Sequence, residues 1–98
     1  MKVIWKYDMC IGDQEILMPK DAVIIDVQDQ RGILTMWAKV DTDKPEVHRK
    51  FCIYGTGNEI HNDERLYYIK SVQMDPFVWH VFEQHDKKVL GSAEVVQK

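Results

Sequence analysis

The sequence RKFCIYGTG, residues 49–57, decides how the rest of the chain can fold. It begins as a strand carrying Phe51, Ile53 and Tyr54 and ends abruptly at Gly55-Thr-Gly57, because glycines accept backbone angles that stop a strand. Further along, a strand pair closes with FVWHVFE, residues 77–83. Apolar strands bounded by tight turns are typical of a small, mostly β domain.

Short runs of β-branched, aromatic and alternating apolar residues recur along the chain. They predict seven strands, at Val3–Tyr7, Gln14–Met18, Ala22–Gln28, Ile33–Val40, His48–Tyr54, Tyr67–Met74 and Phe77–Gln84. We expect the first two to form a hairpin, the third and fourth a second, around a turn at Asp29–Gly32, and the last two a third. The pattern predicts an all-β fold, mainly an antiparallel meander curled into a small barrel or sandwich, with at most one short helical turn.

Side-chain alternation predicts which faces of the central strands are buried. Val23, Ile25 and Val27 should share one face, and alternate residues from Leu34 to Val40 should share another. Trp37 falls on the opposite side, with Thr35 and Lys39. An outward tryptophan could mark an interface, or it could pack under the polar loop 41–46.

Length and composition indicate one domain. The 98 residues are 45% hydrophobic and 30% charged, which is globular composition. We assign residues 1–85 to a single β-rich domain, in which Asn62 could cap one helical turn through its side chain. The tail, residues 86–98, could add an edge strand, a short helix or nothing ordered.

Charge and cysteine usage exclude several classes of protein. The net charge of −3 implies no general affinity for nucleic acid or an anionic membrane. No apolar run approaches the roughly 20 residues that cross a bilayer. Cys10 and Cys52 lack a CxxC spacing and favour a reducing compartment, so we expect a soluble cytoplasmic protein with two free thiols.

The turn after Tyr54 is the first candidate for a binding site. Gly55-Thr-Gly57 could cradle an anion, although no nucleotide-binding motif continues it and a structural turn is the favoured interpretation. If a small anionic ligand binds here, Arg49, Lys50, Tyr54, Thr56 and Gly57 are the candidate residues, with arginine supplying a fork and tyrosine a stacking face. Trp37 joins the candidates as an outward aromatic residue.

The histidines offer little catalytic pattern. None of His48, His61, His80 and His85 pairs at HxH or HxxxH spacing, so we predict no metal site and no cofactor. His61, near Asp63 and Glu64, is the best position for a general base or a ligand contact, but solvated loop polarity also explains it. We expect no catalytic residues and no enzyme activity.

Six pieces of the chain in order carry a resemblance: MKVIWKY, ILMPKDAVIIDVQ, TMWAKVD, FCIYGTGNEI, YIKSVQ and VWHVFE. Together they resemble a family of small uncharacterised proteins encoded by bacteriophages and prophages. The resemblance spans roughly residues 1–83 and implies a phage or prophage origin. It brings no catalytic residues with it.

The expected function is therefore binding. We expect a phage protein that counters bacterial immunity by sequestering a small nucleotide signal or by blocking a host defence protein. The alternative is a structural or interaction module in phage morphogenesis or host takeover, and an enzyme using His61 ranks last. Short β domains often pair their edges, so we also expect a homodimer.

Overall fold

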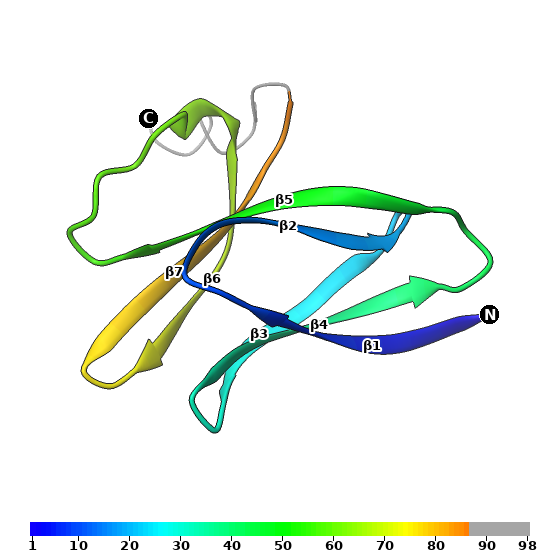
Figure 1. Cartoon of the computed structure of the whole chain (residues 1–98), viewed down its shortest axis with the longest axis horizontal. Coiled ribbons are helices and arrows are strands. Elements are labelled where there is room, and N and C mark those ends of the chain that lie inside the picture. The colour runs from blue at the N-terminus through cyan, green and yellow to red at the C-terminus, as the bar shows by residue number, and fades with distance from the viewer. Residues whose placement is uncertain (87–98) are drawn as a thin grey trace.

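The computed structural model describes residues 1–86 and confirms the all-β prediction (Figure 1). The strands are β1 (Lys2–Met9), β2 (Gly12–Pro19), β3 (Val23–Gln30), β4 (Ile33–Asp41), β5 (Glu46–Gly55), β6 (Leu66–Met74) and β7 (Phe77–Gln84). One 3-10 turn, η1 (Asp63–Arg65), precedes β6. The predicted tail from residue 87 onwards lies outside the described residues. No helix in the described part is long and apolar enough to cross a membrane.

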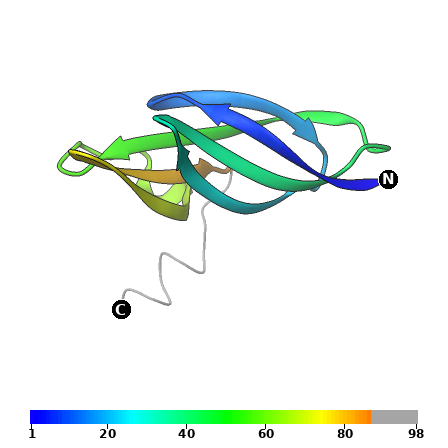
Figure 2. The ribbon, with the colours of Figure 1, turned by 90° about the horizontal axis from the view of Figure 1, so that it is seen from below.

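The strands form two antiparallel sheets that pack face to face. One sheet has the order β1-β4-β3 and the other the order β2-β5-β7-β6. Figure 2 shows the flattened shape that results, and the principal extents are 39 × 34 × 20 Å. The predicted β3–β4 and β6–β7 hairpins are both present.

The predicted hairpin of the first two strands is wrong. β1 pairs with β4 and β2 pairs with β5, so the chain changes sheets between Met9 and Gly12. The backbone of Gly12 has φ 99, and the side chain of Gln14 accepts a hydrogen bond from the amide of Cys10. This corner sends β1 and β2 to opposite layers, so both can bury a face in one core.

The core lies between the sheets, around Phe51 and Met36, both of which are fully buried. The predicted buried face of β4 is confirmed, because the alternate residues from Leu34 to Val40 are all buried, but Thr35, predicted on the opposite face, is buried as well. The turn between β3 and β4 also forms as predicted, with positive φ at Arg31 and Gly32. The carboxylate of Asp29 accepts a hydrogen bond from the amide of Gly32 at 2.7 Å, which closes the turn.

Two local predictions fail for identifiable reasons. Val23, Ile25 and Val27 do not share a face, because a β-bulge between Ile24 and Asp26 inserts an extra residue and reverses the alternation. Val27 is buried, whereas Val23 and Ile25 are exposed. The turn at Asn62 is present, but Asn62 makes no side-chain cap because its backbone is itself left-handed, with φ 56.

Candidate functional site

The outer face of the four-stranded sheet gathers a row of aromatic side chains. Tyr54 of β5, Phe82 of β7 and Tyr68 of β6 lie side by side, with edge-to-face contacts at centroid distances of 6.0 Å and 5.6 Å. Because facing residues of paired strands point to the same side of a sheet, Tyr54, His80 and Ser71 share this face. The predicted site residue Tyr54 therefore belongs to a larger surface than the Gly-Thr-Gly turn.

A chain of hydroxyl groups runs through His80 on the same face. The Oγ1 of Thr56 lies 2.8 Å from Nε2 of His80, and the Oγ of Ser71 lies 2.7 Å from Nδ1. The phenol of Tyr68 continues the chain at 2.9 Å from Ser71. We call Thr56, His80, Ser71 and Tyr68 the hydroxyl chain.

The hydroxyl chain can present donors and acceptors, but it differs from a catalytic triad. A neutral imidazole donates a hydrogen bond from one ring nitrogen and accepts one at the other. One of the two hydroxyls therefore accepts a hydrogen bond from His80, and the other donates one to it. In a triad, a carboxylate orients the imidazole. Here each ring nitrogen of His80 instead contacts a neutral hydroxyl, Nδ1 that of Ser71 and Nε2 that of Thr56. The hydroxyl chain was not predicted from the sequence. A signal for part of it existed, because a hairpin that turns at Asp75-Pro76 sets Ser71 opposite His80.

The Gly55-Thr-Gly57 turn is closed from within. The amide of Gly55 donates to Oδ1 of Asn58 at 2.7 Å, and the amide of Asn58 donates back to the carbonyl of Gly55 at 3.0 Å. A Cβ atom at Gly55 would lie only 3.0 Å from the ring of Trp79 and from Oδ1 of Asn58, and Gly57 has φ 92. Both glycines thus have structural reasons to be there. The amide of Gly55 already donates its hydrogen bond to Asn58.

The predicted ligand residues are not brought together. Arg49 points between the sheets, Lys50 is exposed and lies opposite Glu15 and Gln84, and Trp37 is half-buried in the other sheet. His61 is exposed, and within residues 1–86 the structure records no hydrogen bond or ion pair from its imidazole to Asp63 or Glu64.

Arg49 is engaged by the protein itself. Its guanidinium donates to both carboxylate oxygens of Glu83, at 2.7 Å and 2.9 Å, and its third nitrogen donates to the carbonyl of Ala22 at 2.6 Å. The hydrogen bonds that Arg49 donates to Glu83 raise the pKa of Arg49. The fork that sequence analysis assigned to an anionic ligand is therefore occupied by a carboxylate of β7.

A groove of about 680 Å³ opens where the two sheets meet at β3 and β6. We call it the seam groove, and it is lined by Ala22, Val23, Ile24, Ile25, Asp26, Arg49, Tyr67, Tyr68, Ile69, Lys70, Glu83 and His85. Val23, Ile25, Tyr67 and Tyr68 are between 51% and 55% exposed, although all are apolar or aromatic. Tyr68 also belongs to the hydroxyl chain, so the groove and the outer face are continuous.

One ion pair bridges the two strands that flank the seam groove. The ammonium group of Lys70 on β6 donates to the carboxylate of Asp26 on β3. Both residues follow β-bulges, which lie between Ile24 and Asp26 and between Tyr68 and Lys70. The bridge lowers the pKa of Asp26, chiefly through the hydrogen bond from Lys70.

The described part of the chain shows no preformed metal centre. Within residues 1–86, no group of three or more His, Cys, Asp or Glu side chains is placed to hold a metal ion. Both cysteines are free, Cys10 exposed and Cys52 buried. Burial raises the pKa of Cys52 to about 11, with Asp13 acting in the same direction.

Fold and site together define an all-β domain of two antiparallel sheets with a groove at the open seam between them. The chain belongs to the family described as a domain of unknown function, DUF7352, whose family model matches residues 1–91. No curated protein and no solved structure matches the chain.

Proposed function

We propose that this chain is a non-catalytic binding protein of phage origin that counters bacterial immunity in the host cytoplasm by blocking a defence protein. The seam groove carries this proposal, because contiguous exposed apolar side chains mark interaction sites. The resemblance of the sequence to phage-encoded proteins supplies the biological setting.

The chemistry of the seam groove favours an extended, uncharged polypeptide segment as its occupant. β3 and β6 each stand at the end of their sheet, so each has one hydrogen-bonded neighbour among the described strands and a free edge. Free strand edges bind extended segments through backbone hydrogen bonds. The charged groups in the groove are already paired as Arg49 with Glu83 and Lys70 with Asp26. The groove therefore selects for backbone and apolar groups rather than for charge.

The same pairing weighs against a nucleotide as the ligand. A phosphate group would compete with Glu83 for the guanidinium of Arg49, and with the side chain of Asn58 for the amide of Gly55. Breaking a buried charge pair is costly, so anion capture at these groups would carry a penalty. Between the two forms of inhibition expected from the sequence, the geometry favours the blocking of a protein.

The test is restoration of phage growth in bacteria that carry a panel of defence systems and express this protein. Where growth is restored, Ile25→Asp should abolish the effect, because it places a charge in the apolar part of the groove. Leu17→Asp is the matched control, since Leu17 is a similarly exposed apolar residue on β2. If Ile25→Asp protects the phage as well as Leu17→Asp does, with both variants folded, the groove is not the binding surface.

Two further measurements separate the competing functions. Cyclic and linear nucleotides should not raise the melting temperature, because a ligand that binds only the folded state must stabilise it. A fluorophosphonate probe should not label Ser71, because a serine activated as a nucleophile would react with it. A nucleotide-dependent shift would support sequestration, and labelling of Ser71 would contradict the non-catalytic proposal.

A further inference from the structure

The outer edge of β1 is an open pairing surface. β1 is the end strand of the three-stranded sheet, and its eight residues pair with β4 in one unbroken register from Lys2 to Met9. Two of the other end strands are interrupted, and the third, β2, ends in a proline. β3 and β6 contain β-bulges, and β2 ends at Pro19, which cannot donate a backbone hydrogen bond. Among the described end strands, β1 therefore combines an unbroken register of eight residues with an edge free of proline.

The structure fixes which backbone groups of β1 face outward. The amide of Thr42 donates to the carbonyl of Met1 at 2.9 Å, and the β1–β4 register continues from this pair. Hydrogen bonding alternates along an antiparallel pair, so the odd-numbered residues of β1 bond to β4. The amides and carbonyls of Lys2, Ile4, Lys6 and Asp8 thus point to the free edge.

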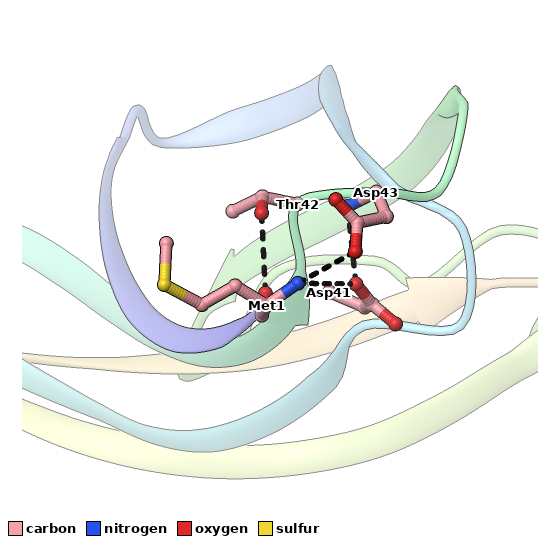
Figure 3. A network of polar contacts seen from close by, with 4 residues as sticks. All are labelled: Met1, Asp41, Thr42 and Asp43. Atoms are coloured by element: carbon pink, nitrogen blue, oxygen red, sulfur yellow. Dashed lines mark hydrogen bonds and ion pairs between the residues drawn. The ribbon is translucent and has the colours of Figure 1, made fainter.

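The first residue holds this edge in place (Figure 3). The amino group of Met1 donates to the carboxylates of Asp43, at 2.8 Å, and Asp41, at 3.2 Å. Thr42 adds a side-chain hydrogen bond to the carbonyl of Met1. Because β1 is anchored to the β4 side at its start, pairing at the opposite edge needs little further ordering of the strand.

We propose that β1 pairs antiparallel with β1 of a second copy of this chain, with Trp5 facing Trp5 at the two-fold axis. In a symmetric pair, the even-numbered residues must face one another, because their backbone groups point to the free edge. Three registers then place the two-fold axis near the middle of β1. Centring on Ile4 sets Lys2 against Lys6, and centring on Lys6 sets that lysine against its own copy. Centring on Trp5 sets Lys2 against Asp8 and Ile4 against Lys6.

Charge complementarity selects the register centred on Trp5. Opposite charges on facing residues stabilise a strand pair and like charges destabilise it. Each copy contributes Lys2 and Asp8, so the symmetric pair contains two such contacts. Ile4, 62% exposed in the single chain, is covered by the stem of the facing Lys6. The two three-stranded sheets become one continuous six-stranded sheet.

A cysteine scan tests the register. In a Cys10→Ser background, which removes the exposed thiol, Trp5→Cys should form a disulfide-linked dimer on oxidation with diamide. Facing residues in the non-hydrogen-bonded position have Cα atoms about 4.5 Å apart, within disulfide range. Ile4→Cys and Lys6→Cys should cross-link far more slowly, because neither faces its own copy. Faster cross-linking of either variant would assign a different register.

Charge variants test the association without a cross-link. Edge pairing buries little surface, so we expect dimers at micromolar concentration by sedimentation equilibrium, at twice the 11.6 kDa of one chain. Asp8→Lys and Lys2→Asp should each weaken association about tenfold, because each sets like charges opposite each other. An equimolar mixture of the two variants should restore association by forming a heterodimer. In that heterodimer a lysine faces an aspartate at both of the contacts between positions 2 and 8.

The matched control is Asp13→Lys, which changes an exposed carboxylate on the edge strand β2 and should leave the dimer unchanged. Melting temperatures confirm that all variants are folded. A wild-type chain that stays at 11.6 kDa up to about 1 mM, or a mixture that does not recover association, would overturn the proposal.

Discussion

Arg49 and Glu83 form a forked ion pair across neighbouring strands, and the same guanidinium reaches the other sheet at the carbonyl of Ala22. One side chain thus connects β5, β7 and the residue directly before β3. Both side chains are at most 19% exposed, so the pair lies largely out of water. This arrangement explains why Arg49 joins the two layers of the fold instead of serving as a free ligand arm.

Removing one member of this pair should destabilise the protein strongly. We expect Glu83→Gln to lower the free energy of unfolding by about 3–5 kcal/mol, because the charge of Arg49 is then left without its partner. The double variant Arg49→Met with Glu83→Leu should recover most of the loss, since neither charge remains. Urea denaturation measures both. Equal losses in the single and double variants would show that the hydrogen bond to Ala22 matters more than the charge pair.

The two cysteines should differ in reactivity. At pH 8 Cys52 is almost entirely protonated, because burial raises its pKa to about 11, and the thiolate is the reactive form. Ellman's reagent should therefore modify Cys10 rapidly and Cys52 only slowly in the folded protein. Cys10→Ser should remove the fast phase, and unfolding in urea should make both thiols reactive. A fast phase that persists in Cys10→Ser would contradict the burial of Cys52.

The bridge between Asp26 and Lys70 should make stability depend on acid pH. Lys70 holds the pKa of Asp26 below its ordinary 3.8, so folding gains stability above that value and loses it as the pH falls through the lower folded pKa. Both side chains are partly exposed, so we expect an effect below about 1 kcal/mol. Urea midpoints from pH 7 to pH 2 measure it. Asp26→Asn should flatten the acid limb, and an unchanged limb would refute the link.

The amino group of Met1 should titrate above its ordinary value. The side-chain hydrogen bonds to Asp43 and then Asp41 raise its pKa from 8.0. This contact favours folding below pH 8.0 and is lost as the pH rises through the raised folded value. Asp43→Asn should lower the pKa, measured by the pH dependence of reductive methylation of the amine, whereas Asp29→Asn, in the β3–β4 turn, should leave it unchanged. Equal pKa values in the two variants would contradict the contact.

Local patterns predicted the strands well and their partners less well. The alternation from Leu34 to Val40 predicted a buried face, and the turn residues Asp29–Gly32 predicted a hairpin, because these signals depend only on neighbouring residues. The sequence did not predict the bulge at Ile25. A bulge is defined by two residues of one strand lying opposite one residue of the paired strand, so it depends on the pairing with β4. The placement of β1 beside β4 likewise depends on contacts distant in the sequence.

The candidate site shows the same division. The sequence singles out Tyr54 and Thr56 as candidates because Tyr54 precedes a glycine turn and Thr56 lies within it. His80 and Ser71 join them only through the pairing of β5, β6 and β7.

Periodicity and turn chemistry are local properties, so the amino-acid order alone was enough to predict an all-β domain, the positions of its strands and two of its hairpins. Tertiary structure alone decided that the chain divides into two sheets after Met9 and that Arg49 binds Glu83. It also decided that β3 and β6 meet with a groove between them. These outcomes depend on which apolar faces can share one core and on which charges that packing brings within hydrogen-bonding distance.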